Sequence, residues 1–297
     1  MKNSYINQLL LGSFLFFFTT NATILQAQDA QPDLGTATIL CDKRPVTITS
    51  FTGAGTATNE GDGTCISTNN ITETNTTWFT WEGATDGSLS FIITPENPND
   101  RIAFVLFDLP NNGDPVALRC AAACFTGSTG LVENDNDAVV NCQDSPNDAF
   151  ARALSMQAGL TYGLMIENTT SDGGFTITFG GNGDLVGPVG QIMPSATAAC
   201  FGQSVTFEED IIFPIPNETI TRYDWLVEDG DNNITETTLV KSPQTLDFAT
   251  TGTKRIELMV TTSTGCNTLF ETFITINDCC ESDNSINIAD NPAITEI

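Results

Sequence analysis

One turn of the chain carries oxygen-bearing side chains at alternate positions. Asp229, Asp231 and Asn233 follow the alternating segment at residues 223–227. This spacing lets side chains converge on one cation, and calcium takes oxygen ligands of this kind. Ile234 stands where a rigid calcium loop needs glycine, so a site here is expected to be weak. The Asp-Gly dipeptide that begins at Asp229 is also a turn signal, so a turn alone explains the same residues.

A second acidic run, ENDNDAVVNCQD, covers residues 133–144. Its carboxylates and amides suit calcium, which is a hard cation. The run lacks the glycine and the terminal glutamate of an EF-hand loop, and a solvated loop would have the same composition. Both interpretations stay open at this stage.

Three tryptophans could form a platform on which a sugar stacks. Trp78 and Trp81 lie in one expected strand and Trp225 in another. Alternation sends Trp78 and Trp81 to opposite faces of their strand, which does not suit a single flat platform. Buried aromatic residues dominate the cores of β-sandwiches, so we expect all three indoles in the core.

The composition excludes several classes of function. The chain has no histidine, which removes Ser-His-Asp and Cys-His nucleophile systems and imidazole-dependent zinc sites. Ten Lys plus Arg against 37 Asp plus Glu give a formal charge of −27, which would repel nucleic acid and an anionic membrane. Paired carboxylates could still support glycoside hydrolysis. No catalytic residue is singled out, and no cofactor is expected apart from calcium.

Nine cysteines indicate an oxidising compartment. They are Cys41, Cys65, Cys120, Cys124, Cys142, Cys200, Cys266, Cys279 and Cys280. Zinc is disfavoured because the Cys-x3-Cys pair at 120 and 124 has no matching second pair. We predict a Cys41–Cys65 bridge. We also predict one bridge from Cys142 to the Cys120/Cys124 pair. The odd count leaves one thiol free or paired outside the chain.

The N-terminus is typical of an export signal. Lys2 precedes the apolar run at residues 9–18, which suits a signal peptide and is short for a membrane span. We predict a signal peptide at residues 1–27, cleaved after Ala27 so that the mature chain begins near Gln28. A retained anchor is the alternative. No later segment could span a membrane, so no membrane insertion is expected after cleavage.

The remaining chain is rich in short strand patterns separated by turn residues. The expected strands of the first half cover residues 45–51, 77–81, 88–94, 102–109, 160–168 and 174–180. A glycine-rich stretch follows, and we assign residues 182–187 as a linker. The predicted division is therefore a module at 33–181, a second domain at 188–278 and a tail at 279–297 that could be truncated.

The second domain resembles a PKD (polycystic kidney disease) domain. The similarity rests on the segments 200–210, 223–231, 242–266 and 270–276, which occur in the family's order. Val227, Glu228 and Arg255 depart from the pattern, which usually has Phe, Gly and Tyr there. The resemblance implies an immunoglobulin-like sandwich with a buried indole at Trp225, and some such domains bind calcium at the acidic turn. It also suggests pairing of Cys200 with Cys266, although strand order makes Cys279 or Cys280 an alternative partner for Cys200.

The first domain is similar to the sandwich module that begins secreted, PKD-containing surface proteins of gliding bacteria. The segments 76–95, 102–109 and 158–181 carry the similarity, together with Arg119-Cys120. The acidic pair common in that family is broken here by Asn99-Asp100-Arg101. The resemblance implies a gliding-motility-associated, adhesin-like role.

Together these features predict an all-β protein made of two β-sandwich domains in tandem, the first jelly-roll-like and the second immunoglobulin-like. We expect a secreted or cell-surface, non-enzymatic binding or adhesion protein with a glycan or protein ligand. The alternative is an accessory, non-catalytic portion of a larger secreted polysaccharide-degrading enzyme. A catalytic domain in the same reading frame would favour the enzyme, and repeats with a sorting domain would favour the adhesin.

Overall fold

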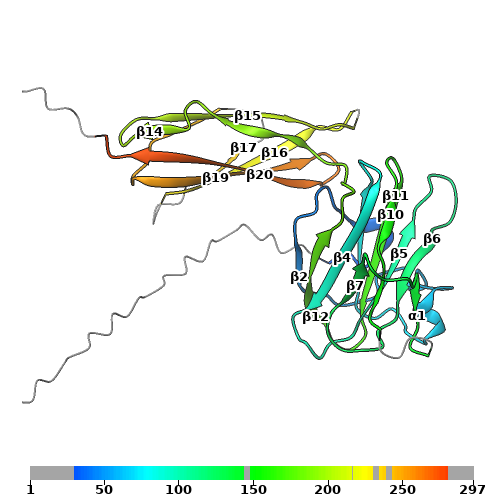
Figure 1. The fold of residues 1–297 in the computed structure, drawn as a ribbon. Helices are drawn as coiled ribbons and strands as arrows, with labels where there is room; N and C mark the ends of the chain where they lie inside the picture. The colour runs from blue at the N-terminus through cyan, green and yellow to red at the C-terminus, as the bar shows by residue number, and fades with distance from the viewer. Residues whose placement is uncertain (1–29, 144–147, 216, 230–233, 239–242, 280–297) are drawn as a thin grey trace, which may run out of the picture.

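The structure is a computed structural model that describes residues 30–143, 148–215, 217–229, 234–238 and 243–279, with no side-chain description for 234–238. The predicted signal peptide, Asp231, Asn233, Cys280 and the tail beyond it lie outside these residues. Nearly all of the regular secondary structure in the described residues is β-strand, which confirms the predicted all-β class (Figure 1). Within these ranges, no helix is both long and apolar enough to cross a membrane.

Two sheets of residues 38–180 pack face to face, and we call residues 30–185 the N-terminal sandwich. The first sheet has the order β1 (Thr38–Ile39), β3 (Thr76–Glu82), β11 (Thr161–Asn168), β5 (Ile102–Asp108), β6 (Val116–Ala121) and β8 (Val139–Val140). The second has the order β2 (Val46–Ser50), β12 (Gly173–Gly180), β4 (Gly87–Pro95), β7 (Thr129–Val132) and β9 (Phe150–Arg152), with β10 (Leu154–Met156) paired to β4.

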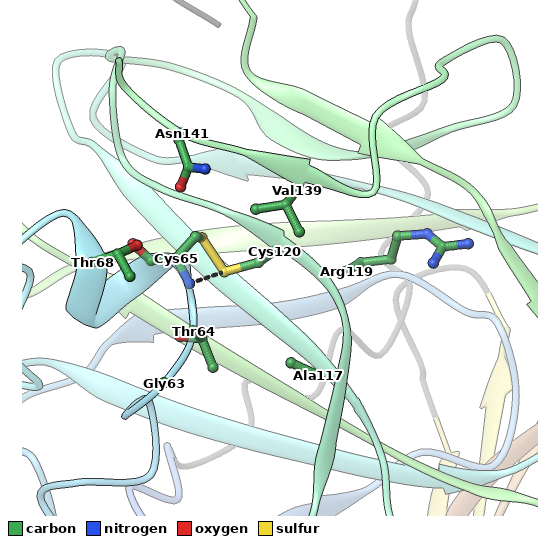
Figure 2. A pocket seen from close by; sticks show the side chains of 9 residues that line it. All are labelled: Gly63, Thr64, Cys65, Thr68, Ala117, Arg119, Cys120, Val139 and Asn141. Atoms are coloured by element: carbon green, nitrogen blue, oxygen red, sulfur yellow. Dashed lines mark hydrogen bonds between the residues drawn. A yellow bond between two sulfur atoms is a disulfide. The ribbon is translucent and has the colours of Figure 1, made fainter. Parts of the chain in front are cut away.

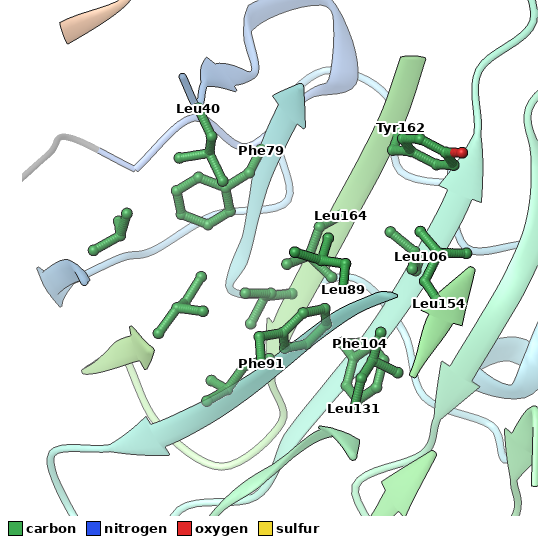
Figure 3. Packing of buried hydrophobic residues seen from close by; sticks show 14 of the residues in the cluster. Leu40, Phe79, Leu89, Phe91, Phe104, Leu106, Leu131, Leu154, Tyr162 and Leu164 are labelled. Carbon is green, nitrogen blue, oxygen red and sulfur yellow. The ribbon is translucent and has the colours of Figure 1, made fainter. Parts of the chain in front are cut away.

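The core of this sandwich consists of the facing side chains of the two sheets. Because side chains alternate along a strand, every second residue of β3, β4, β5 and β11 points inward. Phe91 of β4 meets Phe104 of β5 edge to face, with 5.3 Å between ring centroids. Trp81 stacks on its cross-strand partner Tyr162 at 5.9 Å. Figure 3 shows leucines and aromatic rings from both sheets filling this layer.

A second, smaller core covers the outer face of the first sheet. Trp78, three residues before Trp81, points to this opposite face and stacks on Phe107 at 5.4 Å. The layer is covered by the short elements η1 (Leu34–Thr36) and α1 (Cys65–Thr68), whose Ile66 is buried there. The prediction that Trp78 and Trp81 occupy opposite faces, both in core packing, is therefore confirmed.

Residues 189–277 form two further sheets around a separate core, and we call residues 189–279 the C-terminal sandwich. One sheet has the order β13 (Val189–Pro194), β15 (Val205–Ile212) and β18 (Gln244–Leu246). The other has the order β14 (Ala198–Cys200), β20 (Asn267–Asn277), β19 (Gly252–Thr262), β16 (Ile220–Glu228) and β17 (Ile234–Thr238). Trp225 lies in the core between them, as predicted.

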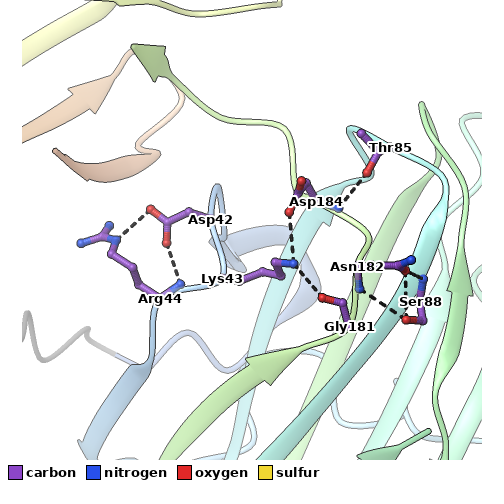
Figure 4. Close-up of polar contacts among 8 residues, drawn as sticks. All are labelled: Asp42, Lys43, Arg44, Thr85, Ser88, Gly181, Asn182 and Asp184. Carbon is purple, nitrogen blue, oxygen red and sulfur yellow. Dashed lines mark hydrogen bonds and ion pairs between the residues drawn. The ribbon is translucent and has the colours of Figure 1, made fainter. Parts of the chain in front are cut away.

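The segment assigned as a linker is held against the N-terminal sandwich (Figure 4). Lys43 Nζ lies 3.1 Å from Asp184 Oδ1 and donates to the Gly181 carbonyl at 3.1 Å. Asn182 Oδ1 accepts a hydrogen bond from the Ser88 N–H at 2.7 Å. Leu185 is buried in the sandwich core. Polar contacts and one buried leucine therefore hold residues of the predicted glycine-rich linker against the N-terminal sandwich.

The described residues contain four cystines. They are Cys41–Cys266, Cys65–Cys120, Cys124–Cys142 and Cys200–Cys279. The predicted bridge from Cys142 to the 120/124 pair is confirmed with Cys124. Cys200 pairs with Cys279, the alternative partner, and not with Cys266, the partner suggested by the PKD resemblance.

The predicted Cys41–Cys65 bridge is wrong, and the reason is the path of the chain between these residues. Residues 51–75 do not return as a hairpin; they cross the outer face of the first sheet and bring Cys65 onto β6, where it meets Cys120. Cys41 follows β1 and meets the C-terminal sandwich at Cys266 instead.

Candidate functional site

The short helix α1 lies between two hollows on the surface of the N-terminal sandwich. Thr64 caps the helix, because its hydroxyl accepts a hydrogen bond from the Ile66 N–H at 3.2 Å. The Cys65–Cys120 cystine fixes the first residue of α1 to β6. A helix of four residues would be marginal alone, so this bridge and the burial of Ile66 hold it in place.

The first hollow has a volume of about 320 Å³ and lies over the Cys65–Cys120 cystine (Figure 2). Polar groups of Thr64, Thr68 and Asn141 border it. Arg119 also contributes to its wall, while its guanidinium donates to the main-chain carbonyls of Arg152 at 2.7 Å and Ala153 at 3.0 Å. Burial, with a smaller effect of the neighbouring Arg152 charge, lowers the pKa of Arg119.

The second hollow has a volume of about 460 Å³ and lies beside the other flank of α1. Hydroxyl, amide and carboxylate groups predominate in its wall, with two isoleucines. The lining residues are Thr58, Gly61, Asp62, Ile66, Ser67, Asn70, Ile71, Thr72 and Glu73. Such a surface offers both donors and acceptors to a polar ligand.

Two acidic side chains lie partly buried next to this second hollow. Glu73 Oε1 accepts a hydrogen bond from the Gly61 N–H at 2.7 Å, and Glu60 Oε1 accepts one from the Leu34 N–H at 3.0 Å. The other oxygen of each carboxylate is buried and has no hydrogen-bond partner within the described part of the chain. Burial raises the pKa of Glu73, and the charges of Glu60 and Glu167 raise it further. Burial likewise raises the pKa of Glu60.

Other buried acids of the N-terminal sandwich have structural partners. Glu167 accepts hydrogen bonds from the hydroxyls of Thr74 at 2.6 Å and Thr76 at 2.7 Å, and from main-chain N–H groups. Asp100 accepts from the Ser171 hydroxyl at 2.6 Å and the Asn168 amide at 3.0 Å. These carboxylates therefore tie loops to strands.

The acidic turn at Asp229 contains a buried ion pair. Lys254 Nζ lies 2.6 Å from Asp229 Oδ1, and the two side chains are 3% and 1% exposed. The Thr250 hydroxyl donates to Oδ1 at 2.7 Å, and the Ala249 N–H donates to Oδ2 at 2.5 Å. Burial alone would raise the pKa of Asp229, but hydrogen bonds from Lys254 and Thr250 outweigh this effect and hold the pKa below its ordinary value.

Asp229 thus has a structural role in closing the end of the C-terminal core. Asp231 and Asn233, the other proposed calcium ligands, lie outside the described residues. Calcium binding at this turn stays a prediction, which thermal unfolding with calcium and with chelator would test.

The acidic run at 133–144 contributes to a cluster of carboxylates. Oxygens of Asp135, Asp137 and Asp148 all lie within 4.8 Å of one another. Asp135 Oδ1 accepts a hydrogen bond from the Asp137 N–H at 2.7 Å, and Asp148 Oδ1 accepts one from the Phe150 N–H at 2.9 Å. These bonds stabilise the turns, and solvated acidic loops adopt the same arrangement without an ion.

Sequence reasoning did not identify the hollows beside α1. The helix is too short for a 3.6-residue periodicity, and Thr64 gives only a single capping signal. Glu60 and Glu73 lie in a loop whose path over the sheet depends on distant strands. The alternation that places Trp78 on the outer face of the first sheet was the one sequence signal that another segment covers this face.

No protein-family model matches the sequence, and no curated protein matches it either. Among solved structures, a DUF4785 family protein from Legionella pneumophila is similar at 12% identity and a TM-score of 0.36, covering 67% of this chain. The chain spans 61% of the length of that protein.

Two further structures match at lower scores. Murine CRIg is similar at 10% identity and a TM-score of 0.22, covering 31% of this chain and 97% of that chain. The adhesin domain of Epf from Streptococcus pyogenes is similar at 7% identity and a TM-score of 0.21, covering 69% of this chain and 73% of that chain. The strands and cystines of the described residues define a disulfide-bonded, all-β sandwich protein.

Proposed function

We propose that the chain is a secreted, non-enzymatic binding or adhesion protein of the cell surface, and that its ligand is a glycan or a protein. The observation that carries the proposal is the pair of polar hollows beside α1, the first of which borders the Cys65–Cys120 cystine. A few placed polar groups on a rigid scaffold are what a binding site needs to orient its ligand.

The chemistry of the hollows favours a ligand rich in hydroxyl groups. Thr68, Ser67 and Thr72 present hydroxyls, Asn70 and Asn141 present amides, and these groups both donate and accept hydrogen bonds. Sugar hydroxyls have the same dual character. A nucleic acid ligand is disfavoured by the formal charge of −27.

The location of the protein is supported by its cystines. Four disulfides form and persist in an oxidising compartment, outside the cytoplasm. The resemblance of the two halves to modules of secreted surface proteins of gliding bacteria, including the PKD domain, supports adhesion as the role. The alternative, an accessory part of a larger polysaccharide-degrading enzyme, would use the same hollows to hold a polymer.

The test is retention of the purified mature chain on soluble and insoluble polysaccharides. Thr68→Arg and Thr72→Arg each place a long side chain at an exposed position in one hollow, and we expect one of them to abolish retention. Thr251→Arg, at an exposed position of the C-terminal sandwich, is the control with equal charge. Equal retention of all three variants would reject the hollows as the binding site. Cleavage of a polysaccharide, abolished by a single Asp or Glu substitution, would instead establish an enzyme.

A further inference from the structure

The cystine Cys41–Cys266 joins the two sandwiches covalently. Cys41 follows β1 of the N-terminal sandwich, and Cys266 lies in the turn between β19 and β20 of the C-terminal one. Both residues are buried. Beside them, Arg44 Nη2 donates to the Asn267 carbonyl at 2.9 Å, so a polar contact between the sandwiches accompanies the bridge.

The main-chain connection between the sandwiches passes the same point. A Cβ atom at Gly187 would lie 2.2 Å from the Cys41 carbonyl oxygen, so the backbone approaches Cys41 closely enough to require glycine. The cystine and the connecting segment are therefore two parallel covalent links at one junction. The bridge spans 225 residues of sequence and includes the junction in its loop.

This connectivity determines which part of the chain carries tension. When the chain is pulled from residues before Cys41 and after Cys279, the shortest covalent path runs through the Cys41–Cys266 bond and then along β20. Residues 42–265 lie in the closed loop and outside this path. We propose that the cystine is a mechanical clamp, which carries the force around residues 42–265 so that this loop stays folded under load.

The last part of the path is already close to its maximum length. β20 has 11 residues and lies between β14 and β19 in its sheet. A strand rises about 3.4 Å per residue, while a fully extended chain reaches at most about 3.6 Å, so tension lengthens β20 by only a few ångströms. A covalent bond followed by an extended strand makes a stiff connection.

The clamp gives the proposed adhesive function its force resistance, and its biological meaning rests on that function. Its test uses no ligand, so the two proposals fail separately. The measurement is single-molecule stretching of the mature chain, held by handles at its two ends under non-reducing conditions. The parent chain is compared with Cys41→Ser/Cys266→Ser and with the control Cys124→Ser/Cys142→Ser.

The expected lengths follow from the cystine connectivity. In the parent, the path from Cys41 to Cys279 contains about 13 residues of backbone. Without the clamp it runs from residue 41 to Cys65, from Cys120 to Cys124 and from Cys142 to Cys200, about 86 residues in all. The clamp variant should therefore extend about 250 Å further than the parent on complete unfolding.

The control removes a cystine that lies outside the parent's load path, so its extension should equal that of the parent. A parent that lengthens as far as the clamp variant would overturn the proposal. So would a control that extends further than the parent.

A second measurement does not depend on folding of the variants. A protease site is inserted between Pro188 and Val189, and the cut chain is separated without and with reductant. Of the four described cystines, Cys41–Cys266 alone joins the two fragments. We expect one band without reductant and two bands with it. Two bands without reductant would refute the clamp.

Discussion

Replacement of Lys254 by methionine removes the cationic partner of the buried Asp229. The Asp229 carboxylate then stays unpaired at the end of the C-terminal core. The two side chains are 3% and 1% exposed, so solvent cannot replace the lost ammonium. Breaking a buried pair by removing one partner costs about 3–5 kcal/mol, because an uncompensated charge stays behind. We expect Lys254→Met to lower the free energy of unfolding of the C-terminal sandwich by an amount in this range.

Hydrogen exchange followed by mass spectrometry is the suitable assay, because it reports strands of the C-terminal sandwich separately from the other core. The protection of the β16 and β19 amides gives the local free energy of opening. Arg222→Met is the matched control, since Arg222 and Asp224 form an ion pair whose side chains are 53% and 23% exposed. An exposed pair contributes about 0–1 kcal/mol, so the control should stay close to the parent.

The double variant Asp229→Asn/Lys254→Met tests whether the unpaired Asp229 charge causes the loss of stability. If the unpaired charge causes the loss, neutralising Asp229 should restore part of the protection.

The pH dependence of the same protection adds a second criterion. Because the pKa of Asp229 is lower in the folded state, its stabilisation is present above the unfolded value of about 3.9 and is lost as the pH falls through the folded pKa. Equal protection in Lys254→Met and Arg222→Met would refute this reasoning.

Three further predictions follow from other residues. The pKa of Glu73 is raised in the folded state, so the free energy of unfolding should fall as the pH rises from about 4.3 through the folded pKa. In urea melts, Glu73→Gln should reduce this pH dependence, and an unchanged pH dependence would contradict the prediction. Gly130 has φ +150°, and a Cβ there would lie 2.0 Å from the Phe91 carbonyl oxygen. Gly130→Ala should therefore destabilise the N-terminal sandwich by more than the roughly 1 kcal/mol typical of point mutants. An unchanged melting temperature would argue against the close approach. Intact mass of protein from the native host should show a chain beginning near Gln28; a retained Met1 would reject the export signal.

The alternation of side chains along strands was available from the sequence alone. Tyr223, Trp225 and Val227 alternate with polar or partly exposed neighbours, and all three lie in the C-terminal core. Trp78 and Trp81 were assigned to opposite faces for the same reason. A period of two is a local property of an extended chain, so a few neighbouring residues determine it. Composition likewise indicated the oxidising compartment.

Contacts between residues far apart in sequence were decided by the tertiary structure. Cys41 pairs with Cys266 across 225 residues, and Cys65 with Cys120 across 55. Cysteine positions allow many pairings, and only the path of the strands selects among them. The raised pKa of Glu73 arises in the same way, because its burial and its proximity to Glu167 depend on how a loop crosses a sheet. Local pattern determined the strands of this protein, and packing of distant segments determined its cystines and its hollows.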